Sequence, residues 1–467
     1  MNSIKKFMKS KTPAEAIDNI SFNAFNIAAF VLMLVFICMP VCKLVYDITL
    51  VDIFPVPWSK YNLYVLAIGL IFLILYVIKI VRMKKYRSVG EFFSRNRAFA
   101  LFGVFIILMI ISTTVNGFTH LGLFSTPYRR EGLFGYMSYF VYFSLAYISC
   151  NRKLIRAFFC IFTGSASVLA IFPMIDFFSK FDRFSIGGAD YLFYQYNHYG
   201  YYLLMSMITA AMLFITEKKL SLKILFIIEF AIAVFGLLIN DTFGCQIAAI
   251  VTLIFIAIVY SLHKGKFKPI TLFPIAVFAL TALLGCIISN GIKTYVINNY
   301  FQFTVDTDAL TNGFDEDAYS TGISRIRLWK YTLSYISEKP LLGFAAEGTG
   351  ERLYTDVGND IGNGIGNDRC HCEYLQYVVN YGIPAAIIYI AGIMTVYLRG
   401  LIRRKQLSEF NLIGLCVGFA YLVSAVVGNS MFYTAPFLFI MLGFGYSLYS
   451  PGNENPSDEL KDSVSAE

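Results

Sequence analysis

The sequence predicts an all-α polytopic membrane protein with about 12 transmembrane helices, the number of apolar stretches near the 20 residues that span a bilayer. The chain has 467 residues, of which 57% are hydrophobic and 15% charged, and its mean hydropathy is +0.63. That composition is typical of a membrane protein. Lysine and arginine also gather on alternate connections between the apolar stretches, as they do in multi-pass proteins.

The apolar stretches are expected in this order: 22–45, 62–81, 99–115, 133–148, 155–177, 199–215, 224–239, 247–262, 270–288, 375–398, 412–427 and 434–448. Several are shorter than a full bilayer crossing needs, so their boundaries are soft.

Charge distribution predicts the orientation. Most of the 38 lysines and arginines fall on one set of connections, which we expect to be cytoplasmic, and most of the 30 acidic residues fall on the other set. The expected division is therefore a cytoplasmic N-terminus (1–21), helices 1–9 (22–288), a large extracytoplasmic loop (289–373), helices 10–12 (374–449) and a disordered cytoplasmic tail (450–467) in the plasma membrane. The net charge of +8 then reflects topology and anionic lipid rather than nucleic-acid binding.

The expected loop 289–373 is unusually long, and long loops are commonly functional. Its acidic residues between 306 and 317 lack the spacing of an EF-hand, which favours a solvated acidic stretch over a calcium site. Residues 324–338 predict an amphipathic helix with Ile326, Trp329, Leu333 and Ile336 on its apolar face and Pro340 as its stop. The glycine-rich segment 357–368 suggests a mobile lid or hinge.

The loop ends in NDRCHCEY, where His371 lies between Cys370 and Cys372. A structural zinc site needs four ligands, and no second ligand pair occurs in the outer loops, so both cysteines are interpreted as small packing residues and no metal is expected. His371 is either an interfacial polar residue at a helix start or a catalytic group. A histidine suits proton transfer near neutral pH.

Arginines in the same loop favour the catalytic interpretation. Arg325, Arg327 and Arg369 share it with His371, and arginine binds phosphate with two parallel hydrogen bonds. Because an outer leaflet can present diphosphate-linked lipids, these residues together suggest transfer chemistry on a phosphorylated carrier.

Four segments resemble the O-antigen ligase and polymerase superfamily: TGISRIRLWKYTLSYISEKPLLGFAAEGTG (321–350), DRCHCEYLQYVVNYGIPAAIIYI (368–390), STPYRREGLFGYMSYFVYF (125–143) and QYNHYGYYLLM (195–205). The resemblance implies a metal-independent glycosyltransferase without cofactor. It would transfer or polymerise oligosaccharide from an undecaprenyl-diphosphate carrier onto an acceptor glycan or lipid at the outer face of the membrane, alongside other polysaccharide-assembly proteins. His371 matches the essential histidine of the family, and Arg325 best matches its loop arginine, with Arg327 as a neighbouring substitute.

Two positions depart from the family pattern. Cys372 follows the histidine where the family often has asparagine, and NDTFGCQIAAI lacks the arginine that many ligases carry at the start of a mid-chain helix. Arg129 or Arg130 is a candidate to supply that charge, although either also suits an interfacial anchor. The missing arginine favours a polymerase over a single-step ligase.

Other polar residues leave alternatives open. Asn197 and His198 begin a helix and are candidates to bind carrier phosphate through its N-terminus, while interface packing explains His198 equally well. Glu229 lies mid-span, where an interhelical hydrogen bond is favoured over a proton relay. A secondary transporter or lipid-oligosaccharide flippase, and a non-catalytic assembly protein, remain the competing classes. A transporter would place its polar groups at the membrane midplane rather than in one loop.

Overall fold

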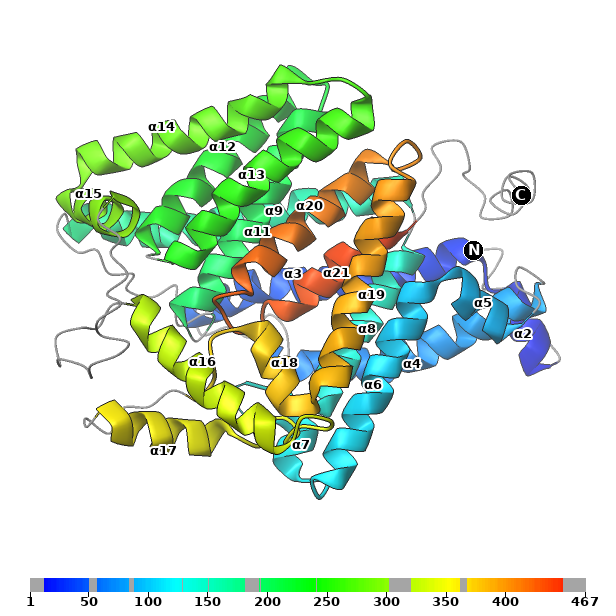
Figure 1. Cartoon of the computed structure of the whole chain (residues 1–467). Helices are drawn as coiled ribbons and strands as arrows, with labels where there is room; N and C mark the ends of the chain where they lie inside the picture. Colours follow the sequence, from blue (N-terminus) through cyan, green and yellow to red (C-terminus); the bar gives the residue numbers. More distant parts are fainter. Residues whose placement is uncertain are drawn as a thin grey trace.

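The computed structural model describes residues 12–49, 57–83, 88–127, 129–149, 151–180, 193, 195–240, 242–301, 321–361 and 368–447. Every regular element in these ranges is helical, and no strand occurs within them, so the expected all-α fold is confirmed (Figure 1). The acidic stretch 306–317 and the tail 450–467 lie outside the described residues.

Nine helices of the described chain are long and apolar enough to cross a membrane. They are α3 (Phe22–Thr49), α4 (Trp58–Arg82), α6 (Arg97–Val115), α9 (Arg152–Lys180), α11 (Tyr196–Thr216), α12 (Leu220–Ile239), α13 (Phe243–Lys264), α14 (Leu272–Ile288) and α19 (Ile383–Ile402). Three shorter apolar helices occupy the other expected positions: α8 (Leu133–Ile148), α20 (Glu409–Ser424) and α21 (Ala435–Tyr446). The count of twelve spans stays a prediction because these three are short.

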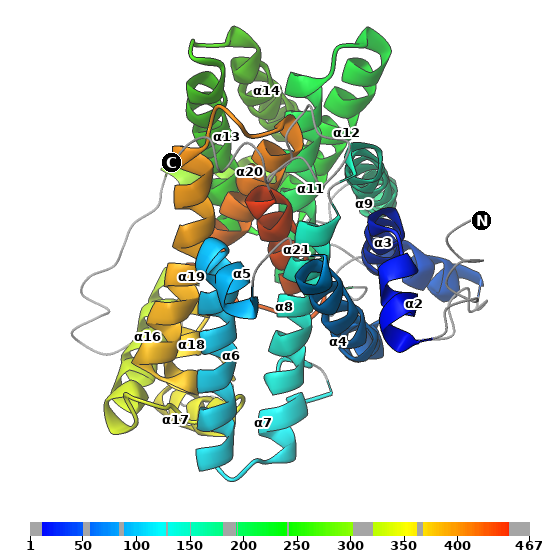
Figure 2. The ribbon, with the colours of Figure 1, turned by 90° about the vertical axis from the view of Figure 1, so that its right-hand side faces the viewer.

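The short helices α20 and α21 lie in the centre of the bundle together with α11 (Figure 2). Helix α11 packs against α9, α12, α13 and α20, and α21 packs against α8 and α20. Every residue of α21 is buried. A helix surrounded by protein exchanges lipid contacts for close side-chain packing, which is the main attraction between helices in a bilayer.

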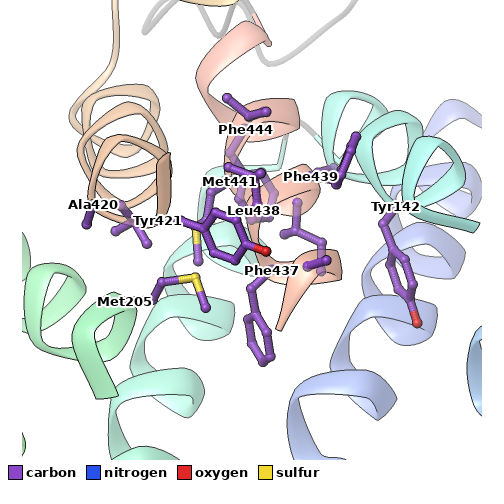
Figure 3. Close-up of a cluster of buried hydrophobic side chains, with 14 of the residues drawn as sticks. Tyr142, Met205, Ala420, Tyr421, Phe437, Leu438, Phe439, Met441 and Phe444 are labelled. Atoms are coloured by element: carbon purple, nitrogen blue, oxygen red, sulfur yellow. The ribbon is translucent and has the colours of Figure 1, made fainter. Parts of the chain in front are cut away.

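Aromatic side chains fill this centre (Figure 3). The ring of Phe437 on α21 lies 5.0 Å from that of Phe36, 4.9 Å from that of Phe162 and 5.6 Å from that of Tyr202. These partners belong to α3, α9 and α11, so one side chain joins four helices. Offset and edge-on aromatic pairs of this kind each add to the packing energy.

The expected span 375–398 is wrong in one respect, because a sharp turn divides it. Helix α18 (Glu373–Tyr381) ends at Gly382, where φ is +87°, and α19 begins directly after it. The amide of Gly382 donates to the Val378 carbonyl at 2.8 Å, and that of Ile383 donates to the Pro340 carbonyl at 2.8 Å. A side chain at Gly382 would strike the backbone of Leu341, so the turn requires glycine.

Between α14 and α19 the chain forms α15 (Asn290–Val296), a π-helical turn (Ile297–Phe301), α16 (Thr321–Glu338), α17 (Gly350–Ile361) and α18. Helices α16 and α17 gather at one end of the molecule with the short α7 (His120–Phe124) (Figures 1 and 2). Two further short helices, α2 (Pro13–Asn19) and α5 (Val89–Arg95), lie elsewhere.

The expected helix 324–338 is confirmed as α16, but its predicted apolar face is partly wrong. Leu328, Tyr335 and Ile336 are buried, whereas Ile326 and Leu333 are exposed. The buried residues form a small core with Leu353, Val357 and Val379. The face is rotated because α16 packs against α17 and α18, which a pattern within α16 alone does not reveal.

The expected lid 357–368 is also corrected in part. Its first five residues belong to α17, and Val357 is buried in the core beneath α16. Residues 362–367 lie outside the described chain. Helix α17 therefore continues into the glycine-rich segment, further than the glycine content suggests.

Candidate functional site

His371 occupies a tight turn between α17 and α18 with φ at +51°. This left-handed conformation is uncommon for a residue with a side chain and marks a strained position. The turn is held on both sides, because the Cys370 amide donates to Gln376 Oε1 at 3.3 Å and the Glu373 amide donates to the Ala425 carbonyl at 3.0 Å. The imidazole is therefore presented from a fixed backbone.

Three arginines act on His371: Arg369, two residues before it, and Arg325 and Arg129 from other parts of the chain. Burial and the charges of Arg325, Arg129 and Arg369 together lower the pKa of His371 to about 4, and Asp368 opposes them. A histidine with so low a pKa is neutral at physiological pH. The imidazole can therefore accept a proton, which is what a general base requires.

Arg325 lies on the first turns of α16, half-buried. Its charge acts on Tyr196, Tyr201 and Cys245, and burial lowers the pKa of Arg325. Within the part of the chain that the structure describes, its guanidinium makes no hydrogen bond or ion pair. Arg325 thus places a positive charge near His371 that no carboxylate of the described residues pairs with.

Arg327 follows two residues later on the same helix and is half-buried. Side chains two positions apart leave an α-helix about 200° apart, since each residue turns about 100°. The structure consequently directs Arg325 and Arg327 to nearly opposite faces of α16.

Arg369 is fully buried between two carboxylates. Its Nη1 lies 2.8 Å from Glu131 Oε2, and its Nη2 lies 2.5 Å from Glu347 Oε1. Burial alone would raise the pKa of Glu347, yet Arg369 lowers it. We refer to Glu131, Arg369 and Glu347 as the carboxylate clamp. The sequence suggested Arg369 for substrate binding. In the structure both terminal nitrogens of its guanidinium are instead engaged by ion pairs within the protein.

Three hydroxyl groups complete the carboxylate clamp. Tyr139 and Ser430 each donate to Glu131 at 3.0 Å, and Ser125 donates to Glu347 at 2.6 Å. A buried ion pair is stable only when its remaining hydrogen-bonding positions are filled. These donors fill positions on both carboxylates, whereas Arg369 Nε has no hydrogen-bond partner among the described residues. They also connect the His371 turn to α8 and to the segment between α20 and α21.

Arg129 and Arg130 are neighbours in sequence with different surroundings. Arg129 forms a two-pronged ion pair with Asp368, at 2.9 Å from Nε and 2.5 Å from Nη2. Arg130, with φ at +54°, lines a small cavity with Asn62 and Phe134 between α4 and α8. Only Arg129 is thereby brought to the His371 turn by a contact in the described chain.

His198 lies in the first turn of α11 and is fully buried, while Asn197 beside it is half-buried. The charges that act on His198 are those of Arg129, Arg369 and His371. Five of the eight residues that the sequence indicates are therefore gathered in one place: Arg129, His198, Arg325, Arg369 and His371. Of the other three, Arg130 lines the cavity between α4 and α8, Arg327 lies about 200° around α16 from Arg325, and Asn197 stands beside His198.

Glu373 is a neighbour of His371 that the sequence analysis did not single out. Its buried carboxylate accepts hydrogen bonds from Tyr377 at 2.8 Å, Tyr421 at 3.0 Å and Tyr389 at 3.5 Å. Burial raises the pKa of Glu373 to about 7. The three tyrosines come from α18, α19 and α20, so this carboxyl fixes the start of α18 directly after the His371 turn.

The sequence analysis did not predict roles for Glu131 and Glu373, although one feature of the sequence indicates them. Glu131 and Glu373 each stand within segments that resemble the family, beside residues that were selected. An acidic residue in a buried, apolar context needs a partner, and that argument would have linked both to the arginines or tyrosines nearby.

The cysteines that flank His371 are buried free thiols. Cys370 Sγ donates to the Cys372 carbonyl at 3.2 Å, and burial raises the pKa of Cys370 to about 12. A thiol with a raised pKa is a poor nucleophile. Among the described residues, no group of three or more histidine, cysteine or acidic side chains is placed to hold a metal ion.

Comparison with known proteins gives one family match. Residues 228–390 match the family described as O-antigen ligase, a region that includes Arg325, Arg369 and His371. Arg129, Glu131 and His198 lie outside the matched region. No curated protein matches the chain. The helical fold is that of a multi-pass membrane protein, and the match over residues 228–390 supports placing this chain in the O-antigen ligase superfamily.

Proposed function

We propose that this protein transfers or polymerises oligosaccharide from an undecaprenyl-diphosphate carrier onto an acceptor glycan hydroxyl at the outer face of the plasma membrane, in the assembly of surface polysaccharide. One observation carries the proposal: the charge of Arg325, which has no ion pair among the described residues, acts on His371, a neutral imidazole held in a strained turn. One group can accept a proton and the other can stabilise an anionic leaving group.

The reaction follows from these two roles. The acceptor hydroxyl oxygen forms a bond to the anomeric carbon of the donor sugar while His371 takes the hydroxyl proton. The bond between the anomeric carbon and the phosphate oxygen breaks, and its electron pair leaves with the diphosphate beside Arg325. Direct displacement of this kind inverts the anomeric configuration.

The other arginines have different roles in this proposal. The ion pairs of Arg129 with Asp368 and of Arg369 with Glu131 and Glu347 favour positioning of the His371 turn over direct contact with the diphosphate. Arg327 and Arg130 remain candidates for more distant contacts with the carrier. Asn197, half-buried beside His198, remains a candidate for carrier binding.

The segment that lacks the arginine of many ligases receives charge from Arg325. Cys245 lies in that segment, on α13, and the charge of Arg325, on α16, acts on it. In this proposal Arg325 alone supplies the positive charge that many ligases obtain from two residues, the loop arginine and the arginine at the start of the mid-chain helix. We retain the polymerase as the first assignment and the single-step ligase, acting on a lipid or protein acceptor, as the alternative.

A transfer assay separates these possibilities. Purified protein in nanodiscs is incubated with the lipid-diphosphate oligosaccharide of its own host, and the products are resolved by size. A ladder of repeats identifies a polymerase, and one fixed addition to a supplied acceptor identifies a ligase. A protein that moves the intact lipid between leaflets without lengthening the glycan is a flippase, which contradicts the proposal.

Variants test the two residues. His371→Ala and Arg325→Ala are expected to lower transfer by at least about a hundredfold, the usual contribution of a general base or an electrostatic stabiliser. Lys330→Ala is the matched control, because Lys330 is an exposed basic residue on the same helix as Arg325. It is expected to retain the rate of the wild type.

A further inference from the structure

His198 is a buried histidine whose ring has no hydrogen-bond partner in the part of the chain that the structure describes. Its exposed fraction is 0%, and neither Nδ1 nor Nε2 has a hydrogen-bond partner among the described residues. Buried polar atoms in proteins almost always have a partner, and an unsatisfied one costs about 1–3 kcal/mol. An imidazole that only filled space in the helix bundle would be replaced at lower cost by an apolar side chain.

We infer that His198 forms a hydroxyl-binding subsite for the acceptor glycan, beside His371. This inference rests on the proposed function and deepens it, because it names the chemical group that the second histidine recognises. It assigns His198 to a sugar hydroxyl rather than to the carrier phosphate.

The charges around His198 separate these two ligands. The arginines that act on it are Arg129 and Arg369. Arg129 is paired with Asp368, and Arg369 is held by Glu131 and Glu347. Three carboxylates thus face two guanidinium groups, which leaves no surplus positive charge for an anion. Arg325, in contrast, makes no ion pair within the described chain and suits the diphosphate.

Hydrogen-bonding capacity points the same way. A neutral imidazole has one nitrogen that donates and one that accepts. A hydroxyl group both donates and accepts, so the hydroxyls of one sugar can satisfy both nitrogens. The oxygens of an ionised phosphate only accept and would leave one nitrogen without a partner.

The helical turn that carries His198 is held in place. Asn240 Nδ2 donates to the Tyr196 carbonyl at 2.8 Å and thereby holds the first turn of α11. A side chain at Gly200 would come within 2.7 Å of Thr242 Oγ1, so α11 approaches this segment closely. A binding group needs such support to keep its geometry.

His371 connects the two parts of the site. Arg325 is the first of the charges that act on His371, and His371 and His198 share the charges of Arg129 and Arg369. An acceptor hydroxyl beside His198 would lie next to the base that deprotonates it, with the diphosphate on the Arg325 side. In this arrangement the acceptor lies on one side of the His371 imidazole and the donor diphosphate lies on the other.

Two probes that share no chemistry test the assignment. One is the host oligosaccharide released from its carrier, which has hydroxyls and no diphosphate, and the other is undecaprenyl diphosphate, which has no sugar. Binding of each to the full-length protein in nanodiscs is measured by calorimetry. His198→Leu is expected to weaken oligosaccharide binding about tenfold, as loss of a buried hydrogen bond implies. It should leave undecaprenyl diphosphate binding within about twofold.

Arg325→Met is expected to give the opposite pattern: it should weaken the binding of undecaprenyl diphosphate and leave the binding of the oligosaccharide nearly unchanged. His198→Gln, which keeps a donor and an acceptor, should restore part of the oligosaccharide affinity. Thr209→Val is the control for a change inside α11, because Thr209 is buried and its hydroxyl bonds only within the helix, to the Met205 carbonyl at 2.8 Å. Thermal unfolding of each variant reports whether the fold is intact.

Three results would overturn the inference: equal loss of both probes in His198→Leu, no change in either, or no oligosaccharide binding by the wild type. The transfer assay decides the proposed function separately. A wild type that transfers glycan while His198→Leu binds the oligosaccharide normally refutes only the inference about His198.

Discussion

Arg369 Nη1 lies 2.8 Å from Glu131 Oε2, an ion pair that joins two residues 238 positions apart and leaves both side chains almost inaccessible to solvent. Arg369 stands two residues before His371. The pair therefore connects the turn that carries the candidate base to the segment that opens α8, and it fixes where the imidazole is presented.

Breaking this buried pair is expected to be costly. Glu131→Gln leaves a buried guanidinium without one of its partners, which typically costs about 3–5 kcal/mol. Arg352 and Glu338 form an exposed pair of the same type in the same connection, with distances of 2.8 Å on both prongs. Glu338→Gln is expected to cost less than about 1 kcal/mol. Unfolding temperatures in detergent compare the two, and equal shifts would contradict the structural role of Arg369.

Because the backbone of His371 is strained, substitutions there are expected to change stability and activity in different ways. Glycine adopts a positive φ without penalty, whereas alanine pays about 1 kcal/mol there. His371→Gly is therefore expected to unfold at a higher temperature than His371→Ala, although both abolish transfer. If the alanine variant proved the more stable, the left-handed turn would not be a source of strain.

The pH dependence of transfer reports on His371. Its pKa is lowered to about 4, and the base works in its neutral form. The value of kcat/KM should stay constant as the pH falls to about 5 and decline only as it passes through about 4, the pKa that burial and Arg325 impose. A decline centred near 6.5, the ordinary pKa of histidine, would show that neither burial nor the arginines lower the pKa of the base.

Removing the charge of Arg325 should move this decline. Arg325→Met takes away the largest of the charges that lower the pKa of His371, so the acid limb of its residual activity is expected to shift to higher pH. Arg325→Lys keeps a positive charge and should leave the limb near that of the wild type. An identical limb in all three proteins would mean that another group titrates.

The Glu373 cluster predicts a graded series. Glu373→Leu leaves the hydroxyls of three buried tyrosines without their acceptor, at roughly 1–3 kcal/mol for each unsatisfied group. Glu373→Gln keeps an acceptor oxygen and should be milder. Tyr377→Phe removes a 2.8 Å bond and should destabilise more than Tyr389→Phe, which removes one of 3.5 Å. The order of the unfolding temperatures tests the series, and the reverse order for the two tyrosines would contradict it.

The positions of the membrane helices could be predicted because lipid imposes a local rule: a spanning segment must be apolar and helical. Each of the twelve expected stretches contains a helix of the described chain, and one of them is divided between two helices. The break at Gly382 escaped prediction because apolar residues continue on both sides of it. The bond from the Ile383 amide to Pro340 that accompanies the turn is a contact between distant segments.

The candidate site was predictable to the extent that chemistry marks its residues. His371 and Arg325 stood out as a histidine and an arginine in a long polar connection. The roles of Arg129 and Arg369 could not be predicted, because Asp368, Glu131 and Glu347 decide them and no periodic pattern pairs residues so far apart in sequence. The burial of His198 depends in the same way on the helices that surround α11.

The most direct test of the central claim is the rate at which His371→Ala, purified in nanodiscs, lengthens the host lipid-linked oligosaccharide relative to the wild type. The account predicts product from the wild type and a loss of at least about a hundredfold in the variant, with undecaprenyl diphosphate binding and unfolding temperature preserved. A variant that transfers glycan at the rate of the wild type would contradict the assignment of His371 as the base.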